Sequence, residues 1–249
     1  MKRIVISAIV AILVAGSLAA MTFSTEALRY KVTYKWGLVD KQAGTAILSI
    51  KPTADGYATK LTARSDPWAD KFYRLRDTLS GSIDKNLTPS IYIKVAHEKG
   101  KYDKDIVKFS RKGSSVKGKC YRFRVRKNKA TTDSITLNAS GTTIDMLTAF
   151  YFMRALNYAN MNVGQSTDVN IFSGKKCERL HINYRGRETI EIGDTRVSAY
   201  HITFTFTMGS KKKSSDDMDA WISMDSRHIP LKLEGKLPVG KIRCFYIGG

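Results

Sequence analysis

The segment LRYKVTYKW (28–36) decides the fold, because apolar and polar residues alternate along its whole length. Its apolar positions are Leu28, Tyr30, Val32, Tyr34 and Trp36. Successive side chains of a strand point to opposite faces, so the segment predicts a strand with one buried and one solvated face. The same alternation returns in YRFRVRK (121–127) and YHITFTFT (200–207). This pattern is typical of antiparallel sheet.

Short turn signals separate these strands. TADG (53–56), RKGSS (111–115) and IGDT (192–195) are examples, and such clusters of glycine and small polar residues mark tight connections. The chain contains no linker rich in proline, serine or glycine, no repeat and no low-complexity tract. We therefore expect a single domain over residues 20–249.

One segment has the length and composition of a helix. TTIDMLTAFYFMRALNYA (142–159) predicts a helix near 143–159, with Thr142 and Asp145 placed like a capping box in which Asp replaces Glu. Its apolar residues reach most of the way round the helix, which indicates burial. The predicted fold class is all-β: a curved antiparallel sheet, half-closed barrel or sandwich, with one buried helix against its concave side.

The N-terminus has the features of an export signal. MKRIVISAIVAILVAGSLAAM (1–21) begins with two cations, continues with a short apolar run and ends in small residues. The apolar run is shorter than the ~20 residues that a spanning helix needs. We expect cleavage after Ala19, and no lipid anchor, because no cysteine lies near the cleavage site.

The chain is strongly basic. Its formal net charge is +20, and removal of Lys2 and Arg3 with the signal peptide leaves +18. Residues 94–129 hold 14 Lys and Arg against three acidic residues, a net charge of +11. Outside the cytoplasm, nucleic acid is not an expected partner. Anionic lipid, lipopolysaccharide and acidic polysaccharide are the candidates, and a charge that serves only solubility is the alternative.

Alternation in 121–127 predicts that Arg122, Arg124 and Arg126 line one solvated face of a hairpin, while Tyr121, Phe123 and Val125 face the core. A row of arginines can bind phosphate or carboxylate through paired hydrogen bonds. A solvated face that protects a sheet edge from pairing is the alternative.

The stretch WISMDSRHIP (221–230) contains Ser223, Asp225 and His228 and invites comparison with a catalytic triad. No glycine-rich nucleophile turn or oxyanion hole accompanies the serine. A strand, a polar turn and a second strand explain the stretch better, so it predicts a hairpin. The sequence as a whole contains no recognisable catalytic, metal or cofactor motif and favours a non-enzymatic role.

Three cysteines, Cys120, Cys177 and Cys244, are an odd number, so at least one has no partner within the chain. The sequence does not decide whether two of them form a disulfide.

Three segments, in order, resemble the exported family known as domain of unknown function 3108: residues 28–46, 145–154 and 221–233. The resemblance implies an all-β protein of the Gram-negative envelope, located in the periplasm and similar in fold to a lipoprotein of capsule-secretion operons. It implies no established activity. Met224 and His228 stand where the family pattern has Asp and Arg, so a mechanism resting on that Arg is not carried over.

These observations lead to one expected function and two alternatives. The first is a non-enzymatic periplasmic protein that binds an anionic envelope amphiphile or polysaccharide, serves envelope maintenance or export, and contacts the membrane peripherally. The alternatives are a glycan hydrolase with carboxylates from separate strands and a structural partner of an outer-membrane assembly. The candidate ligand-binding residues are Arg122, Arg124, Arg126, Lys119, Trp36, Trp221 and His228.

Overall fold

The computed structural model describes residues 21–98, 100–127, 129–208, 212–213 and 217–249. The predicted signal peptide, residues 1–19, lies outside the described residues. The described ranges contain two short α-helices, α1 (Pro67–Tyr73) and α2 (Thr148–Arg154), with a 3₁₀ turn at Tyr158–Asn160. Nearly all the remaining structure is strand.

The first eight strands follow one another as a meander. They are β1 (Glu26–Trp36), β2 (Val39–Pro52), β3 (Gly56–Ser65), β4 (Leu75–Asp84), β5 (Pro89–Glu98), β6 (Lys101–Lys112), β7 (Ser115–Arg126) and β8 (Lys129–Ser140).

The second half of the chain supplies eight further strands. They are β9 (Thr143–Asp145), β10 (Ser166–Phe172), β11 (Cys177–Ile192), β12 (Thr195–Met208), β13 (Lys212–Lys213), β14 (Met218–Ser223), β15 (Pro230–Lys236) and β16 (Lys241–Gly248).

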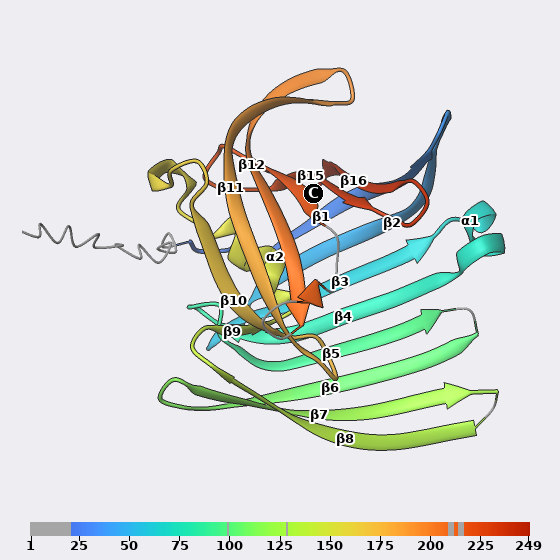
Figure 1. Ribbon diagram of the computed structural model, residues 1–249, viewed down its shortest axis with the longest axis vertical. Helices are drawn as coiled ribbons and strands as arrows, with labels where there is room; N and C mark the ends of the chain where they lie inside the picture. Colours follow the sequence, from blue (N-terminus) through green and yellow to red (C-terminus); the bar gives the residue numbers. More distant parts are fainter. Residues whose placement is uncertain (1–20, 99, 128, 209–211, 214–216) are drawn as a thin grey trace, which may run out of the picture.

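All strands belong to one sheet, in the order β8-β7-β6-β5-β4-β3-β2-β1-β16-β15-β14-β12-β11-β10-β9, with β13 beside β12. Every pair is antiparallel except β9 with β10. The sheet curls into a nearly closed barrel whose end strands are β8 and β9 (Figure 1). The predicted all-β fold class is confirmed.

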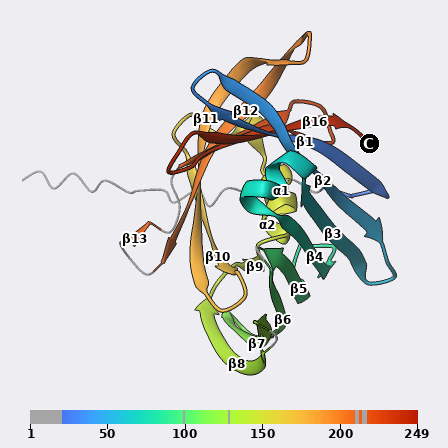
Figure 2. The ribbon, with the colours of Figure 1, turned by 90° about the vertical axis from the view of Figure 1, so that its right-hand side faces the viewer.

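Helix α2 lies inside the curve of this sheet (Figure 2). Leu147 and Tyr151 pack into a core shared with β1–β7, whereas Phe152 and Met153 pack against β10, β11, β12 and β14. The predicted placement of a buried helix against the concave side is therefore confirmed.

The helix is shorter than the predicted 143–159, because residues 143–145 extend the sheet as β9. Asp145, and not Thr142, is the hydrogen-bond acceptor for the free backbone N–H groups at the start of the helix. Its carboxylate accepts hydrogen bonds from the backbone N–H groups of Leu147 (2.8 Å) and Thr148 (2.9 Å) and from the Thr148 hydroxyl (2.7 Å).

Alternate turns of an antiparallel meander lie at the same edge of the sheet. The turns β1–β2, β5–β6, β7–β8 and β15–β16 therefore share an edge with α1, which connects β3 to β4. This edge, at the right in Figure 1, is called the rim below.

Candidate functional site

The three predicted arginines lie on the inner face of β7, which corrects the predicted orientation. Arg122, Arg124 and Arg126 share this face with the buried Cys120, and they alternate with outward-facing Tyr121 and Phe123. The two aromatic side chains are 46 % and 36 % exposed. Alternation correctly grouped the residues by face, but the charged group faces inward.

The neighbouring strand explains this reversal. Asp103 and Asp105 on β6 lie opposite Arg124 and Arg122. Arg124 joins both carboxylates, with Nε 2.9 Å from Asp103 Oδ1 and Nη2 2.5 Å from Asp105 Oδ1. Arg126 Nη2 contacts the two oxygens of Asp103 at 2.6 and 2.8 Å. Because each charge is paired, the arginines can face inward without large desolvation cost.

These arginines line a cavity of about 620 Å³ on the concave side of β3–β7. Across it lies the turn between β10 and β11, where a β-carbon on Gly174 would sit 2.6 Å from Asp105 Oδ2. Lys119, the fourth cation of the predicted set, lies on the opposite, outer face of β7. The sequence pattern predicted that Lys119 and the three arginines belong to one binding site, but the sheet places them on opposite faces.

The rim carries an unusual set of exposed apolar side chains. The turn between β1 and β2 exposes Trp36 (59 %), Leu38 and Val39, and the turn between β15 and β16 exposes Leu237 and Val239. The two turns are in contact: Tyr34 Oη donates to the Val239 carbonyl oxygen at 3.0 Å.

Helix α1 extends this apolar surface. Its Phe72 is 76 % exposed. The helix is held against β2 by Trp68 Nε1, which donates to the Gln42 carbonyl oxygen at 2.5 Å, and Lys41 Nζ lies 4.7 Å from the Trp68 ring centroid. Contiguous exposed apolar side chains of this kind mark interaction surfaces.

Cations surround these apolar residues. Within the part of the chain that the structure describes, the rim lysines without an ion pair are Lys35, Lys41, Lys71, Lys101, Lys127, Lys129 and Lys236. Two of the nearby carboxylates are already engaged, because Asp40 pairs with Arg243 and Asp70 pairs with Arg76. The rim is therefore both apolar and positively charged.

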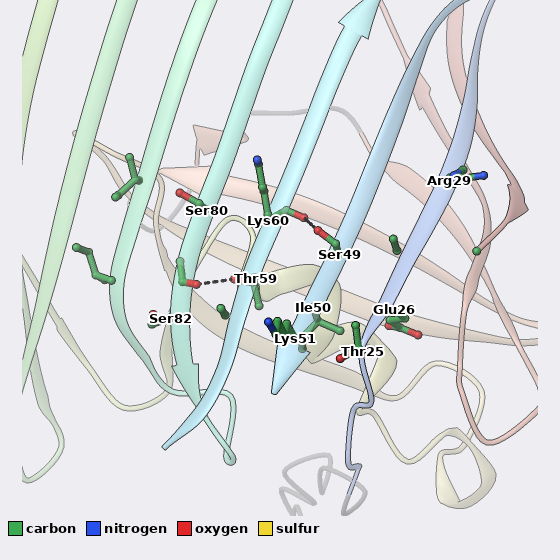
Figure 3. Close-up of a pocket in the computed structure, with 16 residues that line it drawn as sticks. Thr25, Glu26, Arg29, Ser49, Ile50, Lys51, Thr59, Lys60, Ser80 and Ser82 are labelled. Atoms are coloured by element: carbon green, nitrogen blue, oxygen red, sulfur yellow. Dashed lines mark hydrogen bonds between the residues drawn. The ribbon is translucent and has the colours of Figure 1, made fainter. Parts of the chain in front are cut away.

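The outer surface of β1–β5 holds a shallow hollow of about 810 Å³ (Figure 3). Arg29, Lys51 and Lys60 lie around it, among small side chains. Two of its hydroxyls are bonded within the sheet, since Ser49 Oγ donates to the Lys60 carbonyl oxygen (3.3 Å) and Thr59 Oγ1 to that of Gly81 (3.2 Å). The hollow adds positive charge to the outer face but presents few groups for specific recognition.

The segment 221–230 forms the predicted hairpin, with β14 and β15 paired antiparallel. Ser223 Oγ donates to Asp225 Oδ1 (2.7 Å) and accepts from the Ile229 N–H (2.7 Å). His228 Nδ1 instead donates to the Arg154 carbonyl oxygen, at 2.7 Å. The serine and the histidine therefore have separate partners, and the hydrogen bonds do not form a triad.

Trp221 lies within the barrel wall and not at an open site. Its ring is buried, stacks on His201 with centroids 4.8 Å apart, and lies 4.1 Å from Lys232 Nζ. Its Nε1 donates to Glu188 Oε2 at 2.8 Å. Of the three aromatic or histidine residues predicted to bind ligand, Trp36 alone is exposed at the rim.

Arg154 joins three distant parts of the chain. Its guanidinium, 1 % exposed, pairs with Glu26 and donates to the Arg227 carbonyl oxygen from Nε (3.2 Å) and Nη2 (2.9 Å). It also lies 4.9 Å from the Phe23 ring. These contacts of the Arg154 side chain therefore hold together the segments around residues 26, 154 and 227. We call this cluster the Arg154 junction.

Other candidate chemistry is sparse. All three cysteines are free; Cys120 is buried and Cys177 exposed. Burial raises the pKa of Cys120 and Cys244 to about 11. The described residues include no group of three or more His, Cys, Asp or Glu that could hold a metal ion. No helix in the described ranges has the length and apolar character needed to cross a membrane.

The sequence contains a signal for the rim that the sequence analysis missed. KWGLVDK (35–41) and KLPVGK (236–241) both place apolar residues within a turn and lysines on each side. Turn residues are usually polar, because connections run over the surface. Two such turns on strands that pair at one edge would have indicated the patch.

Comparisons with known proteins agree with this fold. The family model described as "Protein of unknown function (DUF3108)" matches residues 29–245. A solved beta-barrel-like protein of domain of unknown function DUF1849 from Brucella abortus is similar in structure, with a TM-score of 0.59 and 10 % identity over 90 % of this chain and 96 % of that chain. No curated protein matches the sequence. The chain belongs to the DUF3108 family.

Proposed function

We propose that the protein is a non-enzymatic protein of the bacterial envelope that docks on an anionic membrane surface through its rim. The observation that carries this proposal is the coincidence, at one edge, of exposed apolar turns with lysines that form no ion pair among the described residues. Location in the periplasm is part of the proposal and rests on the predicted signal peptide. A mature chain beginning near Ala20 in the periplasmic fraction would support it.

The chemistry of the rim matches a membrane interface better than bulk water. Trp36 and Phe72 present aromatic rings of the kind that favour the headgroup region. Leu38 and Val239 can enter the acyl boundary, while Lys35 and Lys236 remain among anionic headgroups. Each lysine near an anionic surface contributes roughly 1 kcal/mol. Apolar insertion and charge together supply the two signals that stable peripheral binding needs.

The opposite edge provides an internal contrast. The turns β2–β3, β4–β5 and β6–β7 expose no large apolar side chain among the described residues. Leu87, within one of them, is buried. Among the described turns of the meander, exposed large apolar side chains therefore occur at the rim edge and not at the opposite edge, as an orientated membrane contact requires.

Vesicle flotation tests the apolar half of the proposal. Wild-type protein should float with vesicles of phosphatidylglycerol and phosphatidylcholine at low salt, and far less with phosphatidylcholine alone. The double variant Leu38→Asp/Val239→Asp should lose most of this binding. Val163→Asp is the control matched in charge to Leu38→Asp alone, since Val163 is 73 % exposed in a loop away from the rim. It should bind like wild type, whereas Leu38→Asp should bind more weakly.

The outcomes separate the candidate partners. Failure of wild-type protein to float with anionic vesicles would contradict the proposal. Salt-sensitive binding to a soluble acidic polysaccharide, unchanged in Leu38→Asp/Val239→Asp, would instead identify a polysaccharide as the partner.

A further inference from the structure

The cavity inside β3–β7 is separate from the rim surface and has two unlike walls. One wall, on β6 and β7, carries the paired charges of Asp103, Asp105 and Arg124. The other, on β3 and β4, is aliphatic and includes Leu61 and Leu79. The volume, about 620 Å³, lies within the usual range for a small-molecule site.

The charged groups nearly cancel. Six cations and five carboxylates line the cavity, a net formal charge of +1. Ion pairs between β6 and β7 hold five of these eleven groups in fixed positions, which is the preorganisation that a binding site needs. A polyanion would meet five carboxylates here, so strong accumulation of negative charge is disfavoured.

Two polar atoms in the cavity lack partners. Asp77 Oδ1 and Arg122 Nε are buried, and neither forms a hydrogen bond. The nearest carboxylate oxygen to Arg122 Nε, Asp105 Oδ1, is 3.7 Å away. One atom is an acceptor and the other a donor, and leaving both unsatisfied costs free energy. Burial, followed by the charge of Glu98, raises the pKa of Asp77.

The cavity has an accessible mouth. The side chains of Arg126 and Asp103 are 41 % and 32 % exposed, and both lie at the end of their strands nearest the rim. Deeper in, Asp105 is covered by the turn that contains Gly174. Asp77 and Arg122 also line this cavity, so a ligand that enters from the rim side can contact their side chains, while Asp77 Oδ1 and Arg122 Nε themselves are shielded from solvent.

From these observations we infer that the cavity binds the sugar ring of a neutral or singly anionic saccharide. A pyranose presents a C–H face suited to the wall of Leu61 and Leu79, and hydroxyls that both donate and accept. Different hydroxyls of the saccharide can hydrogen-bond to the side chains of Asp77 on β4 and Arg122 on β7, which both line the cavity. A fatty acyl chain would offer these polar side chains no hydrogen-bond partner. The inference does not depend on the rim as a membrane-binding surface.

Isothermal titration calorimetry of the full mature protein tests this inference. The saccharide probes are cellobiose, N,N′-diacetylchitobiose and a hyaluronan disaccharide, and octyl glucoside below its micellar concentration tests a glycolipid headgroup against free sugar. Decanoate and tripolyphosphate are the contrasting probes. We expect saturable binding of at least one saccharide or of octyl glucoside, and none of decanoate or tripolyphosphate.

Variants link that binding to the cavity. Asp77→Leu should weaken it by about 10- to 100-fold, because a hydrogen bond to an ionisable group is lost. Asp55→Asn, in an exposed turn, should bind like wild type, and circular dichroism should show both variants folded. No saturable saccharide binding at millimolar concentration, preference for decanoate or tripolyphosphate, or full affinity in folded Asp77→Leu would each overturn the inference.

Discussion

The Arg154 junction and the rim both place a cation beside aromatic and aliphatic side chains. They differ in whether that cation has hydrogen-bond and ion-pair partners within the protein. At the junction the guanidinium is buried and every side of it is occupied, by Glu26, by the Arg227 carbonyl and by Phe23. At the rim, Lys35 and Trp36 lie side by side in solvent.

The same combination of side chains therefore has a structural role at the junction and a binding role at the rim. A satisfied buried cation holds distant segments together and has nothing left to offer a partner. Unpaired lysines beside exposed apolar side chains keep their interactions available. The junction should therefore govern stability and the rim should govern binding, and the two effects should be separable.

Loss of the buried guanidinium should produce the largest change. Arg154→Ala leaves the Glu26 carboxylate without its partner, and removal of one member of a buried pair costs about 3–5 kcal/mol of unfolding free energy. Urea denaturation measures this. Arg179→Ala is the control: its ion pair with Asp168 is exposed on both sides, so it should cost less than about 1 kcal/mol. Equal losses of unfolding free energy in the two variants would contradict the distinction between a buried and an exposed ion pair.

The carboxylate at the start of α2 should make stability depend on pH. Burial raises the pKa of Asp145 from 3.8 to about 6, although hydrogen bonds from Thr148 and Leu147 oppose the shift. A pKa raised by folding favours the folded state below the unfolded pKa, and this stability is lost as the pH rises through about 6. The loss between pH 4 and 7 amounts to about 3 kcal/mol.

Comparison with Asp145→Asn isolates this contribution, because asparagine does not titrate. The unfolding free energy of wild type, measured relative to that of the variant, should fall by about 3 kcal/mol from pH 4 to pH 7. Parallel pH profiles for the two proteins would show that Asp145 is not the titrating group.

Ser223→Ala should have a moderate effect on stability and none on binding. The substitution removes the acceptor of the buried Ile229 N–H, which costs about 1–3 kcal/mol. Flotation with anionic vesicles should be unchanged at a temperature where the variant is folded. A folded variant that has lost binding would return the 221–230 hairpin to the functional site.

Rim substitutions should leave stability almost untouched. Leu38→Asp alters a fully solvent-exposed turn residue, and surface changes of this kind usually shift the unfolding free energy by less than about 0.5 kcal/mol. Thermal denaturation of Leu38→Asp beside wild type checks this. A large drop in melting temperature would mean that the turn is part of the core.

Local patterns predicted the parts of the fold that depend on local chemistry. Alternation around Tyr30 and Val32 indicated a strand, the polar turn after Ser223 indicated a hairpin, and the all-round apolar character near Tyr151 indicated a buried helix. Each interaction involved lies within a few residues or follows from burial alone. These features are present in the structure.

Features that depend on pairing between strands could not be predicted from local sequence patterns. Alternation at Arg122 and Arg124 gives two faces but does not say which is inside. That choice depends on Asp103 and Asp105, brought opposite by the register of β6 and β7. The rim likewise combines turns some 200 positions apart in sequence, through the β1–β16 pairing. Alternation placed Trp36 on a buried face, but β1 extends past the core, and Trp36 is its exposed last residue.

The measurement that tests the central claim most directly is a charge-matched flotation experiment. Lys35→Glu/Lys236→Glu reverses two cations at the rim, and Lys112→Glu/Lys117→Glu reverses two exposed cations near the opposite edge, so both variants have the same net charge. Vesicle affinity at low salt should fall at least about tenfold for the rim pair and change little for the other. Equal losses in both variants would show that net charge alone draws the protein to the membrane, and would contradict a docking surface at the rim.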